Sequence, residues 1–447
     1  MLAKADAWSR DRLSPHLATD TLTRTTRTST RRLAAASAVG TTLEWYDFTV
    51  YNTLAALIFN RLFFPSFDPM TGIILAFSTY AVGYISRPLG GVVFGHLGDK
   101  LGRRFVLFVT VTMMGVNTGL MGLLPTHESI GIMSPILLVT LRLIQGVALG
   151  GEWAGAVLIS VEHGAQEKRG FNASFAQVGP ALGNLLASGC IALVTYRLSA
   201  SEFVSWGWRI PLLSSIVLVA VGLWIRLGVD ETPMFKRLDE TGTKTKTPIA
   251  DVFRVYWRRL MIAGGVRVGS DVLYALIFVF SLTYLTAVRN VSRTFALTAI
   301  IISTIVNAVA ILLCGALSDR VGRRPVYAAG GAFGLVWAFA FFALLDRATP
   351  ISIVIAVVVG SLIHALMCGP QAAFVTEQFP TQVRYAGSSL AYTLAGIVGG
   401  GFAPLIMASL LQRYRTTTQI SLYVAVTLCV TLAALAVARE TAKSKLE

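Results

Sequence analysis

The sequence predicts an all-α membrane protein with twelve transmembrane helices, arranged as two pseudo-symmetric halves of six helices each. Composition, a succession of apolar stretches and an internal repeat all indicate this fold class. Of the 447 residues, 54% are hydrophobic and only 14% are charged. Soluble domains carry about 25% charged residues, so most of this chain must lie in lipid.

The internal repeat is a ten-residue pattern that occurs twice. Residues 95–104 return as residues 315–324, with every matching position 220 residues later. Each copy lies between two apolar stretches, so we expect a tight cytoplasmic turn between two membrane helices. Two homologous membrane halves are typical of transporters that rock one half against the other around a central site.

The apolar stretches define the helices in chain order. A helix needs about 20 apolar residues to span a bilayer. Stretches of that kind lie at about 33–60, 70–94, 104–124, 133–161, 171–196, 206–228, 260–288, 294–317, 325–345, 350–376, 386–411 and 418–438.

Polar segments divide the chain into domains. The long polar segment at 229–258 is predicted to be a flexible cytoplasmic linker between a half at 33–228 and a half at 259–439. Residues 1–32 are expected to form a disordered cytoplasmic tail, and residues 440–447 a short cytoplasmic tail.

Positive charge follows the predicted topology. With both termini inside, all eight lysines fall on the cytoplasmic side, as the positive-inside rule requires. The net charge of +15 therefore reflects membrane orientation and contact with anionic lipid, and we expect no nucleic-acid partner.

Several strings resemble known families. The repeated Gly-x-x-x-Asp-(Arg/Lys)-x-Gly-Arg-Arg pattern resembles the signature of the major facilitator superfamily, and residues 138–150, with Arg142 and Gln145, resemble its second motif. Within it, the chain is similar to the metabolite:proton symporter family through Glu44-Trp-Tyr-Asp47-Phe, Arg87-Pro-Leu-Gly-Gly91, residues 145–153 and Trp206-Gly-Trp-Arg-Ile-Pro211. Residues 55–65 and 94–96 most resemble its shikimate permease branch, and the whole resemblance covers about residues 33–441.

The resemblance implies a function. It implies a monomeric, multi-pass transporter of the bacterial inner membrane that imports a small organic acid, such as shikimate or an oxo- or dicarboxylate, by alternating access. The expected partners are a small organic anion, a proton and the lipid bilayer. The proton is the coupling ion, and no cofactor or metal is expected.

Ionisable side chains inside membrane helices are costly, so we expect each to be functional or paired. Glu44, Asp47 and Tyr51 fall on one stripe of the first helix, at i, i+3 and i+7. In a cavity that opens and closes, a carboxylate near an arginine is able to load and release a proton. The candidates for proton coupling are Glu44, Asp47, Arg142, Glu152 and Asp271. Simple neutralisation of Arg87 or Arg142 by one of these acids is the alternative.

Candidates for substrate binding lie near mid-helix, close to the predicted charges. Arginine is a fixed cation that either grips a carboxylate or tunes a neighbouring acid. Arg267 and Asp271 stand at i, i+4, which leaves a self-contained pair open, and packing is the alternative for Tyr274. His364 is either a hydrogen-bonded structural residue or a proton relay. The full set is Tyr51, Arg87, Arg142, Gln145, Arg267, Tyr274, His364 and Gln371.

The two copies of the repeated pattern supply candidates for a gate. Their glycines allow close helix approach, and their aspartates accept hydrogen bonds from helix N-termini or from arginines across the seam between the halves. Such contacts stabilise a state that is closed on the cytoplasmic side. The gate candidates are Gly95, Asp99, Arg103, Gly315, Asp319 and Arg323.

Other functions fit parts of the sequence. Residues 179–183 partly resemble an antiporter motif, which leaves open a proton-driven exporter of a small organic compound or drug, although Phe175 replaces an expected glycine. An importer of zwitterionic compatible solutes is a further alternative, although no heptads follow the last helix. The sequence contains no catalytic constellation, metal-ligand cluster or phosphate-binding loop, so we expect no enzyme.

Overall fold

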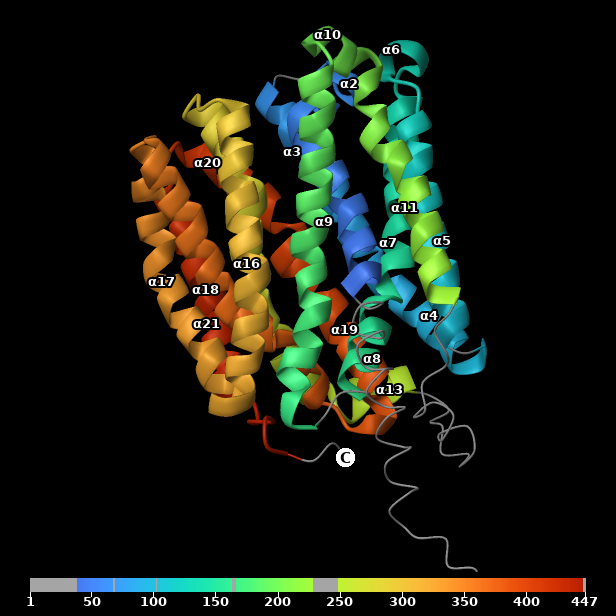
Figure 1. Cartoon of the computed structure of the whole chain (residues 1–447), viewed down its shortest axis with the longest axis vertical. Coiled ribbons are helices and arrows are strands. Elements are labelled where there is room, and N and C mark those ends of the chain that lie inside the picture. The colour runs from blue at the N-terminus through green and yellow to red at the C-terminus, as the bar shows by residue number, and fades with distance from the viewer. Residues whose placement is uncertain (1–37, 67–68, 102, 163–165, 228–247, 445–447) are drawn as a thin grey trace, which may run out of the picture.

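The computed structural model describes residues 38–66, 69–101, 103–162, 166–227 and 248–444. These residues form helices and short connections, without a strand among them. Figure 1 shows two groups of long helices standing side by side, the N-terminal half in blue to green and the C-terminal half in yellow to red. The predicted tail at 1–32, residues 229–247 of the predicted linker and residues 445–447 lie outside the described residues.

The N-terminal half begins with a helix whose described part covers residues 38–54 and continues without a break through two short elements. In order, the elements of this half are η1 Ala55–Phe59, α2 Asn60–Phe63, α3 Pro69–Ile85, α4 Arg87–Leu101, α5 Arg103–Leu123, α6 His127–Ile130, α7 Met133–Gly150, α8 Trp153–Glu162, η2 Gln166–Lys168, α9 Arg169–Arg197, α10 Ala200–Glu202, η3 Phe203–Gly207 and α11 Arg209–Leu227.

The C-terminal half is preceded by a short helix inside the predicted linker, α13 Pro248–Arg254. The remaining elements are α14 Trp257–Tyr274, η4 Ala275–Phe280, α15 Ser281–Thr283, η5 Tyr284–Val288, α16 Arg293–Val321, α17 Arg323–Asp346, α18 Pro350–Glu377, η6 Thr381–Val383, α19 Arg384–Gly396, η7 Ile397–Gly401, α20 Ala403–Tyr414 and α21 Thr418–Val437.

The described helices account for all twelve predicted spans. Eight helical segments are long and apolar enough to cross a membrane, and the pair 200–207 and 209–224, bent by 49°, makes a ninth. The other three are the helices at 38–63, 69–101 and 103–123 of the N-terminal half. The all-α class predicted from the sequence is confirmed.

Two spans of the N-terminal half are interrupted where they pack together. The second span breaks at Ser86, between α3 and α4, and the fourth at Gly151 and Glu152, between α7 and α8. A Cβ atom on Gly150 would lie 1.9 Å from the carbonyl oxygen of Arg87. Only glycine permits this backbone approach, so the two breaks lie against each other near the middle of the half.

The second copy of the repeated pattern joins two helices by a tight turn, as predicted, but most of its residues are helical. Helix α16 continues through residues 315–321, and only Gly322, with φ of +115°, separates it from α17. In the first copy α4 likewise extends to Leu101. In the second copy Gly315 and Asp319 therefore lie on the last two turns of α16, where both contact the start of α9.

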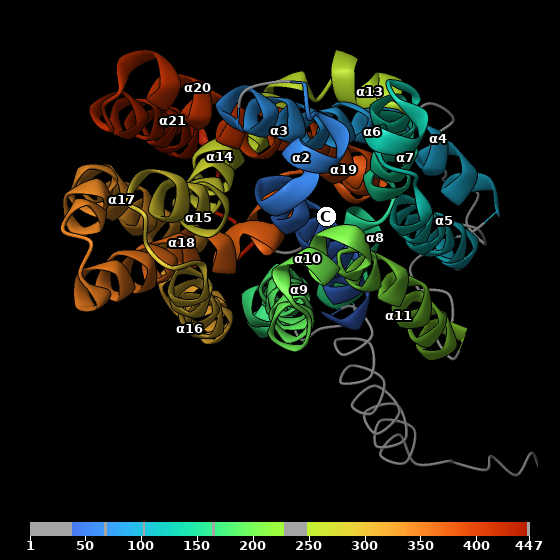
Figure 2. The same cartoon turned by 90° about the horizontal axis from the view of Figure 1, so that it is seen from above.

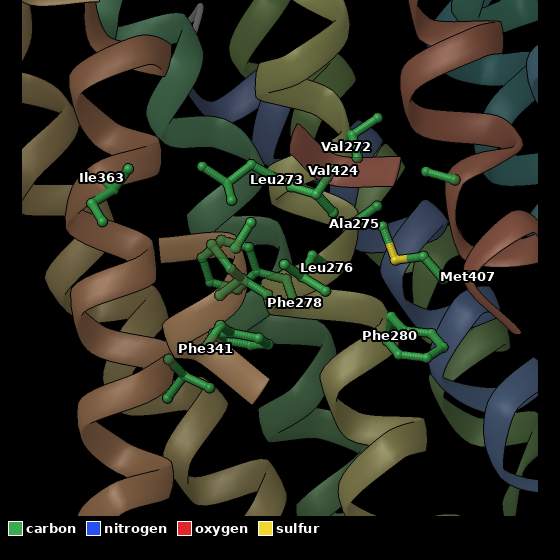
Figure 3. Packing of buried hydrophobic residues seen from close by; sticks show 14 of the residues in the cluster. Val272, Leu273, Ala275, Leu276, Phe278, Phe280, Phe341, Ile363, Met407 and Val424 are labelled. Atoms are coloured by element: carbon green, nitrogen blue, oxygen red, sulfur yellow. The ribbon is translucent and has the colours of Figure 1, made fainter. Parts of the chain in front are cut away.

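The C-terminal half contains a larger buried hydrophobic cluster than the N-terminal half. Figure 3 shows part of the large buried cluster of the C-terminal half, where side chains of α14 and η4 meet those of α17, α18, α20 and α21. The labelled members are Val272, Leu273, Ala275, Leu276, Phe278, Phe280, Phe341, Ile363, Met407 and Val424. Because lipid is as apolar as these side chains, close packing rather than removal from water stabilises the cluster.

The two halves meet along several helix pairs, most closely between α9 and α16 (Figure 2). A Cβ atom on Gly170 would lie 2.7 Å from the carbonyl oxygen of Gly315, and one on Gly315 would lie 2.9 Å from that of Gly170. This close approach lies at the end of the bundle that carries residues 315–324, which we call the signature end.

Candidate functional site

A cavity lies between the two halves, and we call it the central cavity. Both halves supply side chains to it. The N-terminal half contributes Trp45, Tyr84, Gln177 and Pro180, and the C-terminal half contributes Arg267, Asp271, Tyr274, Ala275, Asn307, Ile311, His364, Cys368, Gln371, Tyr392 and Gly400.

An ion pair forms the charged part of the central cavity. Arg267 Nε donates to Asp271 Oδ1 at 3.0 Å and lies 2.9 Å from Asp271 Oδ2. Arg267 Nη1 donates to the carbonyl oxygen of Tyr392 at 2.8 Å, and the guanidinium lies 3.1 Å from the centre of the Tyr392 ring. The Asp271 side chain is 14% exposed, against 5% for Arg267, so the carboxylate is the more accessible partner.

Amide and aromatic side chains join the halves across the central cavity. Gln177 Nε2 donates to Gln371 Oε1 at 3.0 Å, and Gln371 Nε2 donates to the hydroxyl of Tyr327 at 3.3 Å. The rings of Trp153 and Tyr392 stack with centroids 3.9 Å apart and an interplanar angle of 15°. Both contacts must change if one half rocks against the other.

His364 is buried and hydrogen-bonded. Asn307 Nδ2 donates to the carbonyl oxygen of Ser361 at 2.7 Å and lies 3.2 Å from His364 Nδ1. An amide nitrogen donates hydrogen bonds but does not accept them, so His364 Nδ1 is the acceptor. The neutral imidazole ring therefore carries its proton on Nε2. His364 thus combines the predicted structural contact with a remaining donor at the central cavity.

A second group of buried polar residues lies inside the N-terminal half, and we call it the N-half cluster: Asp47, Tyr51, Thr118, Arg142, Gln145 and Ser215. Arg142 Nη1 donates to Gln145 Oε1 at 2.5 Å, and Gln145 Nε2 donates to Thr118 Oγ1 at 2.8 Å. The Arg142 guanidinium lies 3.3 Å from the centre of the Tyr51 ring.

The first helix directs Asp47 and Tyr51 into this cluster. Asp47 is 2% exposed and its Oδ1 accepts a short hydrogen bond from Ser215 of α11. The hydroxyl of Tyr51 shares a short hydrogen bond with Thr79 of α3. Glu44 and Glu152, also predicted for proton coupling, are 3% and 0% exposed.

Arg87 stands between the two regions. Its guanidinium lies 3.9 Å from the centre of the Tyr84 ring, which lines the central cavity, and 4.7 Å from that of Phe48. The Arg142 guanidinium also lies near Phe48, 4.9 Å from the centre of its ring. Phe48 therefore contacts both buried cations.

Most of the predicted site residues consequently fall into two sets. Arg267, Asp271, Tyr274, His364 and Gln371 all line the central cavity. Asp47, Tyr51, Arg142 and Gln145 instead contact one another or their neighbours within one half. The sequence analysis missed five polar or aromatic residues of the central cavity: Trp45, Tyr84, Gln177, Asn307 and Tyr392. Of these, only Trp45 belongs to a motif that the sequence analysis named.

The second copy of the repeated pattern connects the halves at the signature end. Asp319 Oδ1 accepts from the backbone N–H of Gly170 at 2.8 Å, and Oδ2 accepts from that of Phe171 at 2.9 Å. Asp319 also pairs with Arg323 Nη1 at 2.7 Å. It thus caps the first turn of α9 in the other half. Gly95, Asp99 and Arg103 of the first copy fall outside the residues whose side chains the structure describes.

A buried salt bridge reinforces this connection. Arg169 Nε of α9 lies 3.2 Å from Glu377 Oε1 of α18, and both side chains are almost fully buried. Arg169 Nη2 also donates to the carbonyl oxygens of Thr441, Ala442 and Ser444. Removing one partner of such a pair would cost about 3–5 kcal/mol.

The comparisons with known proteins agree with this architecture. The sequence profile of the Major Facilitator Superfamily matches residues 38–404 and, in a second match, residues 267–446. The chain belongs to the Major Facilitator Superfamily. It is therefore a transporter rather than an enzyme, as the sequence predicted.

Its similar relatives are transporters of bacterial membranes. It is 40% identical to the shikimate transporter of Escherichia coli over 387 residues, covering 86% of this chain and 88% of that protein. It is 35% identical over 418 residues to the inner membrane metabolite transport protein YhjE of the same organism, covering 92% of this chain and 95% of that protein. The proline/betaine transporter of Escherichia coli is 31% identical, over 93% of this chain and 85% of that protein.

Solved structures have the same fold. The structure of the proton:xylose symporter XylE bound to 6-bromo-6-deoxy-D-glucose matches with a TM-score of 0.77 and 17% identity, over 94% of this chain and 98% of that one. At this identity the match shows the fold alone. The predicted major facilitator fold is confirmed, and the chain is a multi-pass membrane transporter of a small molecule.

Proposed function

We propose that this protein is a proton-coupled symporter that imports a small organic acid into a bacterial cell by alternating access, as a monomer with both termini in the cytoplasm. The observation that carries the proposal is the Arg267–Asp271 pair, which places one fixed cation and one accessible carboxylate in the central cavity. The proposed coupling ion is the proton, and no other cofactor is required.

The pair couples a proton to an anion by competition. While Asp271 is ionised, it occupies the Nε edge of Arg267, and a substrate carboxylate there would be repelled. Protonation of Asp271 removes the repulsion and frees a guanidinium edge for the substrate. By linkage, the bound anion favours protonation of Asp271 as strongly as protonation favours the anion.

Uncharged groups around the pair would hold the rest of the substrate. Gln371 and Gln177 present amide groups from opposite halves, and His364 presents its Nε2 hydrogen. A substrate that bridges these side chains draws the halves together. Closure around a bound substrate is the step that alternating access requires.

The contacts at the signature end would form the inner gate. Asp319 and Glu377 of the C-terminal half bind the start of α9 in the N-terminal half, so they hold that end closed. With the signature end in the cytoplasm, inward opening must break these contacts. Substrate would then leave the central cavity towards the cell interior.

The N-half cluster supplies a second candidate for the proton. Asp47 is buried beside Ser215, and Arg142 lies in the same cluster. Glu44 and Glu152 stay candidates for proton coupling as well. We assign Asp271 the role of releasing Arg267, and Asp47 the role of a proton site that does not touch the substrate.

A compatible-solute importer is the second candidate. Paired opposite charges suit a zwitterion, and four aromatic rings line the central cavity, as a quaternary ammonium group prefers. However, the rings of Tyr392 and Tyr84 already face the guanidinium groups of Arg267 and Arg87. Those rings are therefore occupied by cations of the protein itself, and an organic anion fits better. A proton-driven exporter uses the same groups in the opposite direction.

Transport by purified protein in vesicles tests the proposal. Labelled shikimate should accumulate when the vesicle interior is alkaline, and a protonophore should abolish accumulation. Glycine betaine in excess should leave the uptake unchanged. Accumulation that persists after collapse of the proton gradient would contradict symport, and release of protons in exchange for substrate would indicate an antiporter.

Neutralising the accessible acid tests its role. Asp271→Asn should abolish accumulation, while counterflow between two substrate pools should survive because exchange moves no net proton. The matched control is Asp251→Asn on α13, which makes the same change away from the central cavity and should accumulate substrate normally. Normal accumulation by Asp271→Asn would remove Asp271 from the coupling mechanism.

A further inference from the structure

A second cavity lies beside the central cavity, and we call it the distal cavity. Tyr274 lines both cavities. The other residues that line the distal cavity are Thr49, Asn52, Thr53, Asn184, Ser188, Phe278, Val279, Leu282, Leu297 and Ile300.

The distal cavity is displaced from the central cavity along the bundle. The first helix contributes Trp45 to the central cavity but Thr49 to the distal one, and α9 contributes Gln177 and then Asn184. The N-terminus of α9 lies at the signature end, so each step moves away from that end. At 1.5 Å per residue the displacement is roughly 5–10 Å. The distal cavity therefore lies on the path between the ion pair and the opposite end.

One wall of the distal cavity is a row of uncharged hydrogen-bonding groups from the N-terminal half. Thr49, Asn52 and Thr53 stand at i, i+3 and i+4 of one helix, and Asn184 and Ser188 at i and i+4 of another. This spacing brings each set onto a single stripe that faces the seam. This stripe is distinct from the positions of Asp47 and Tyr51, which point into the N-half cluster.

The hydrogen-bonding capacity of this wall is only partly used. Asn52 Oδ1 is buried and accepts no hydrogen bond from the residues that the structure describes. Ser188 Oγ donates to Asn184 Oδ1 at 3.1 Å, which leaves the Asn184 amide nitrogen as a donor. A buried acceptor and a nearby donor of this kind match a hydroxyl group, which both donates and accepts.

The opposite wall belongs to the C-terminal half and, apart from Tyr274, is apolar. Phe278, Leu282 and Leu297 cover it, together with Val279 and Ile300. Charged side chains are absent from the described lining of the distal cavity. A carboxylate or an ammonium group would lose its hydration there without gaining a partner of opposite charge, and that loss costs several kcal/mol.

We propose that the distal cavity is a hydroxyl-recognising subsite that selects polyhydroxylated monocarboxylates on their way to Arg267. This inference rests on the proposed function and narrows its substrate class. A ring that carries hydroxyl groups on one side and C–H bonds on the other fits both walls. Dicarboxylates and betaines place a charge where the distal cavity has no partner for it.

Binding of two ring carboxylates to the detergent-purified full chain tests the subsite. Shikimate carries three ring hydroxyls, and cyclohexene carboxylate has the same ring and carboxylate without them. The parent should bind shikimate more tightly. Asn52→Leu should weaken shikimate about five- to tenfold, as expected for one lost neutral hydrogen bond, and should leave cyclohexene carboxylate within about twofold.

Two further variants keep the test decisive. Asn184→Leu makes the same change on the other helix and should give the same selective loss, which covers the case that Asn52→Leu fails to fold. Thr140→Val lies on an exposed face of α7 and should change neither affinity. Equal weakening of both ligands, no weakening of either, or a parent that binds the two ligands equally would overturn the subsite.

The same measurements separate this inference from the proposed function. Binding in detergent needs no proton gradient, so selective loss of shikimate affinity supports the subsite even if vesicle uptake proves independent of protons. Conversely, proton-driven uptake with unaltered selectivity in both asparagine variants would keep the proposed function and remove the subsite.

Discussion

The N-half cluster and the central cavity both bury an arginine beside an acid, but they differ in their relation to the seam between the halves. Arg142, Gln145 and Asp47 contact residues of the N-terminal half. In the central cavity, Gln177 of one half donates to Gln371 of the other. When the halves rock, the cluster is able to move as a rigid unit, whereas the cavity must break and remake its contacts.

This difference assigns the two regions different tasks in the proposed cycle. A group that keeps its neighbours throughout the cycle responds only to changes in access, which suits a proton site. A group whose neighbours change between states distinguishes those states by its contacts, which suits a substrate site. Arg87 lies against Phe48 and Tyr84 and so contacts residues next to both regions.

Removing the cation of the central cavity should have the largest effect. Arg267→Ala takes away the partner of the substrate carboxylate and leaves Asp271 buried without its ion pair, at a cost of about 3–5 kcal/mol. We expect accumulation and counterflow both to fall at least about 100-fold. Arg254→Ala, on an exposed position of α13, is the matched control and should transport normally. Counterflow that survives in Arg267→Ala would place the substrate site elsewhere.

Neutralising the acid of the N-half cluster should separate proton movement from substrate movement. Asp47→Asn keeps an oxygen that accepts from Ser215 but loses the proton-binding group. Concentrative uptake should vanish while counterflow survives, and Arg142→Lys should also impair uptake because it loses the planar fork that bonds to Gln145.

The control for this comparison is Glu128→Gln, an acid-to-amide change on the exposed helix α6. It should accumulate substrate as the parent does. If Asp47→Asn also accumulated substrate against its gradient, the proton site would move to Glu44 or Glu152. If it lost counterflow as well, the two regions would not be separate in function.

The sequence predicted which residues are buried better than it predicted what they face. Hydrophobic stretches gave all twelve spans, because a bilayer demands about 20 apolar residues from every helix. Helical periodicity placed Asp47 and Tyr51 on one stripe, but the packing of neighbouring helices decides whether that stripe faces the seam. Contacts such as that of Gln177 with Gln371 join residues 194 positions apart, and no local sequence pattern predicts such contacts.

The repeated pattern illustrates the same limit. Two apolar flanks suggested a turn, yet Asp319 lies on the last turn of α16 and accepts hydrogen bonds from the start of α9. Asp319 accepts these hydrogen bonds from Gly170 and Phe171 of the other half, which lie 149 and 148 positions away in the sequence. That role depends on how the halves dock, and spacing within the pattern does not specify the partner.

Weakening this connection should change access to the central cavity without changing its chemistry. Asp319→Asn removes the charge that caps α9 and pairs with Arg323, a loss of about 1–2 kcal/mol that favours the open signature end. Cys368 lines the cavity, so its alkylation by a maleimide reports access. With the other three cysteines replaced by serine, labelling should become about 5–30-fold faster than in the parent.

Lys443→Ala, near the same end, provides the control and should leave labelling unchanged. Unaltered labelling of Cys368 in Asp319→Asn would mean that the Arg169–Glu377 bridge alone holds the end closed. A lower affinity for substrate in Asp319→Asn, with unchanged labelling, would instead mean that Asp319 affects substrate binding rather than closure of the signature end.

The smallest effect is expected at Glu440, which lies outside both regions. Burial by itself raises the pKa of this carboxyl, but hydrogen bonds from the backbone N–H groups of Ala442, Arg324, Arg323 and Thr441 outweigh it and hold the pKa below the usual 4.5. Because the folded pKa is the lower one, this stabilisation is fully present above pH 4.5 and is lost as the pH falls through the folded pKa.

Glu440→Gln should therefore lower the melting temperature in detergent by no more than about 2 °C at pH 7, since the group is partly exposed and its charge is screened. The difference from the parent should shrink as the pH falls below 4.5, because the parent carboxylate becomes neutral as the pH passes through its lowered pKa. Shikimate affinity should not change, because Glu440 touches neither cavity nor the N-half cluster. A pH-independent difference would mean that lost packing, rather than lost charge, destabilises the variant, and a changed affinity would show that the C-terminal segment acts on the central cavity.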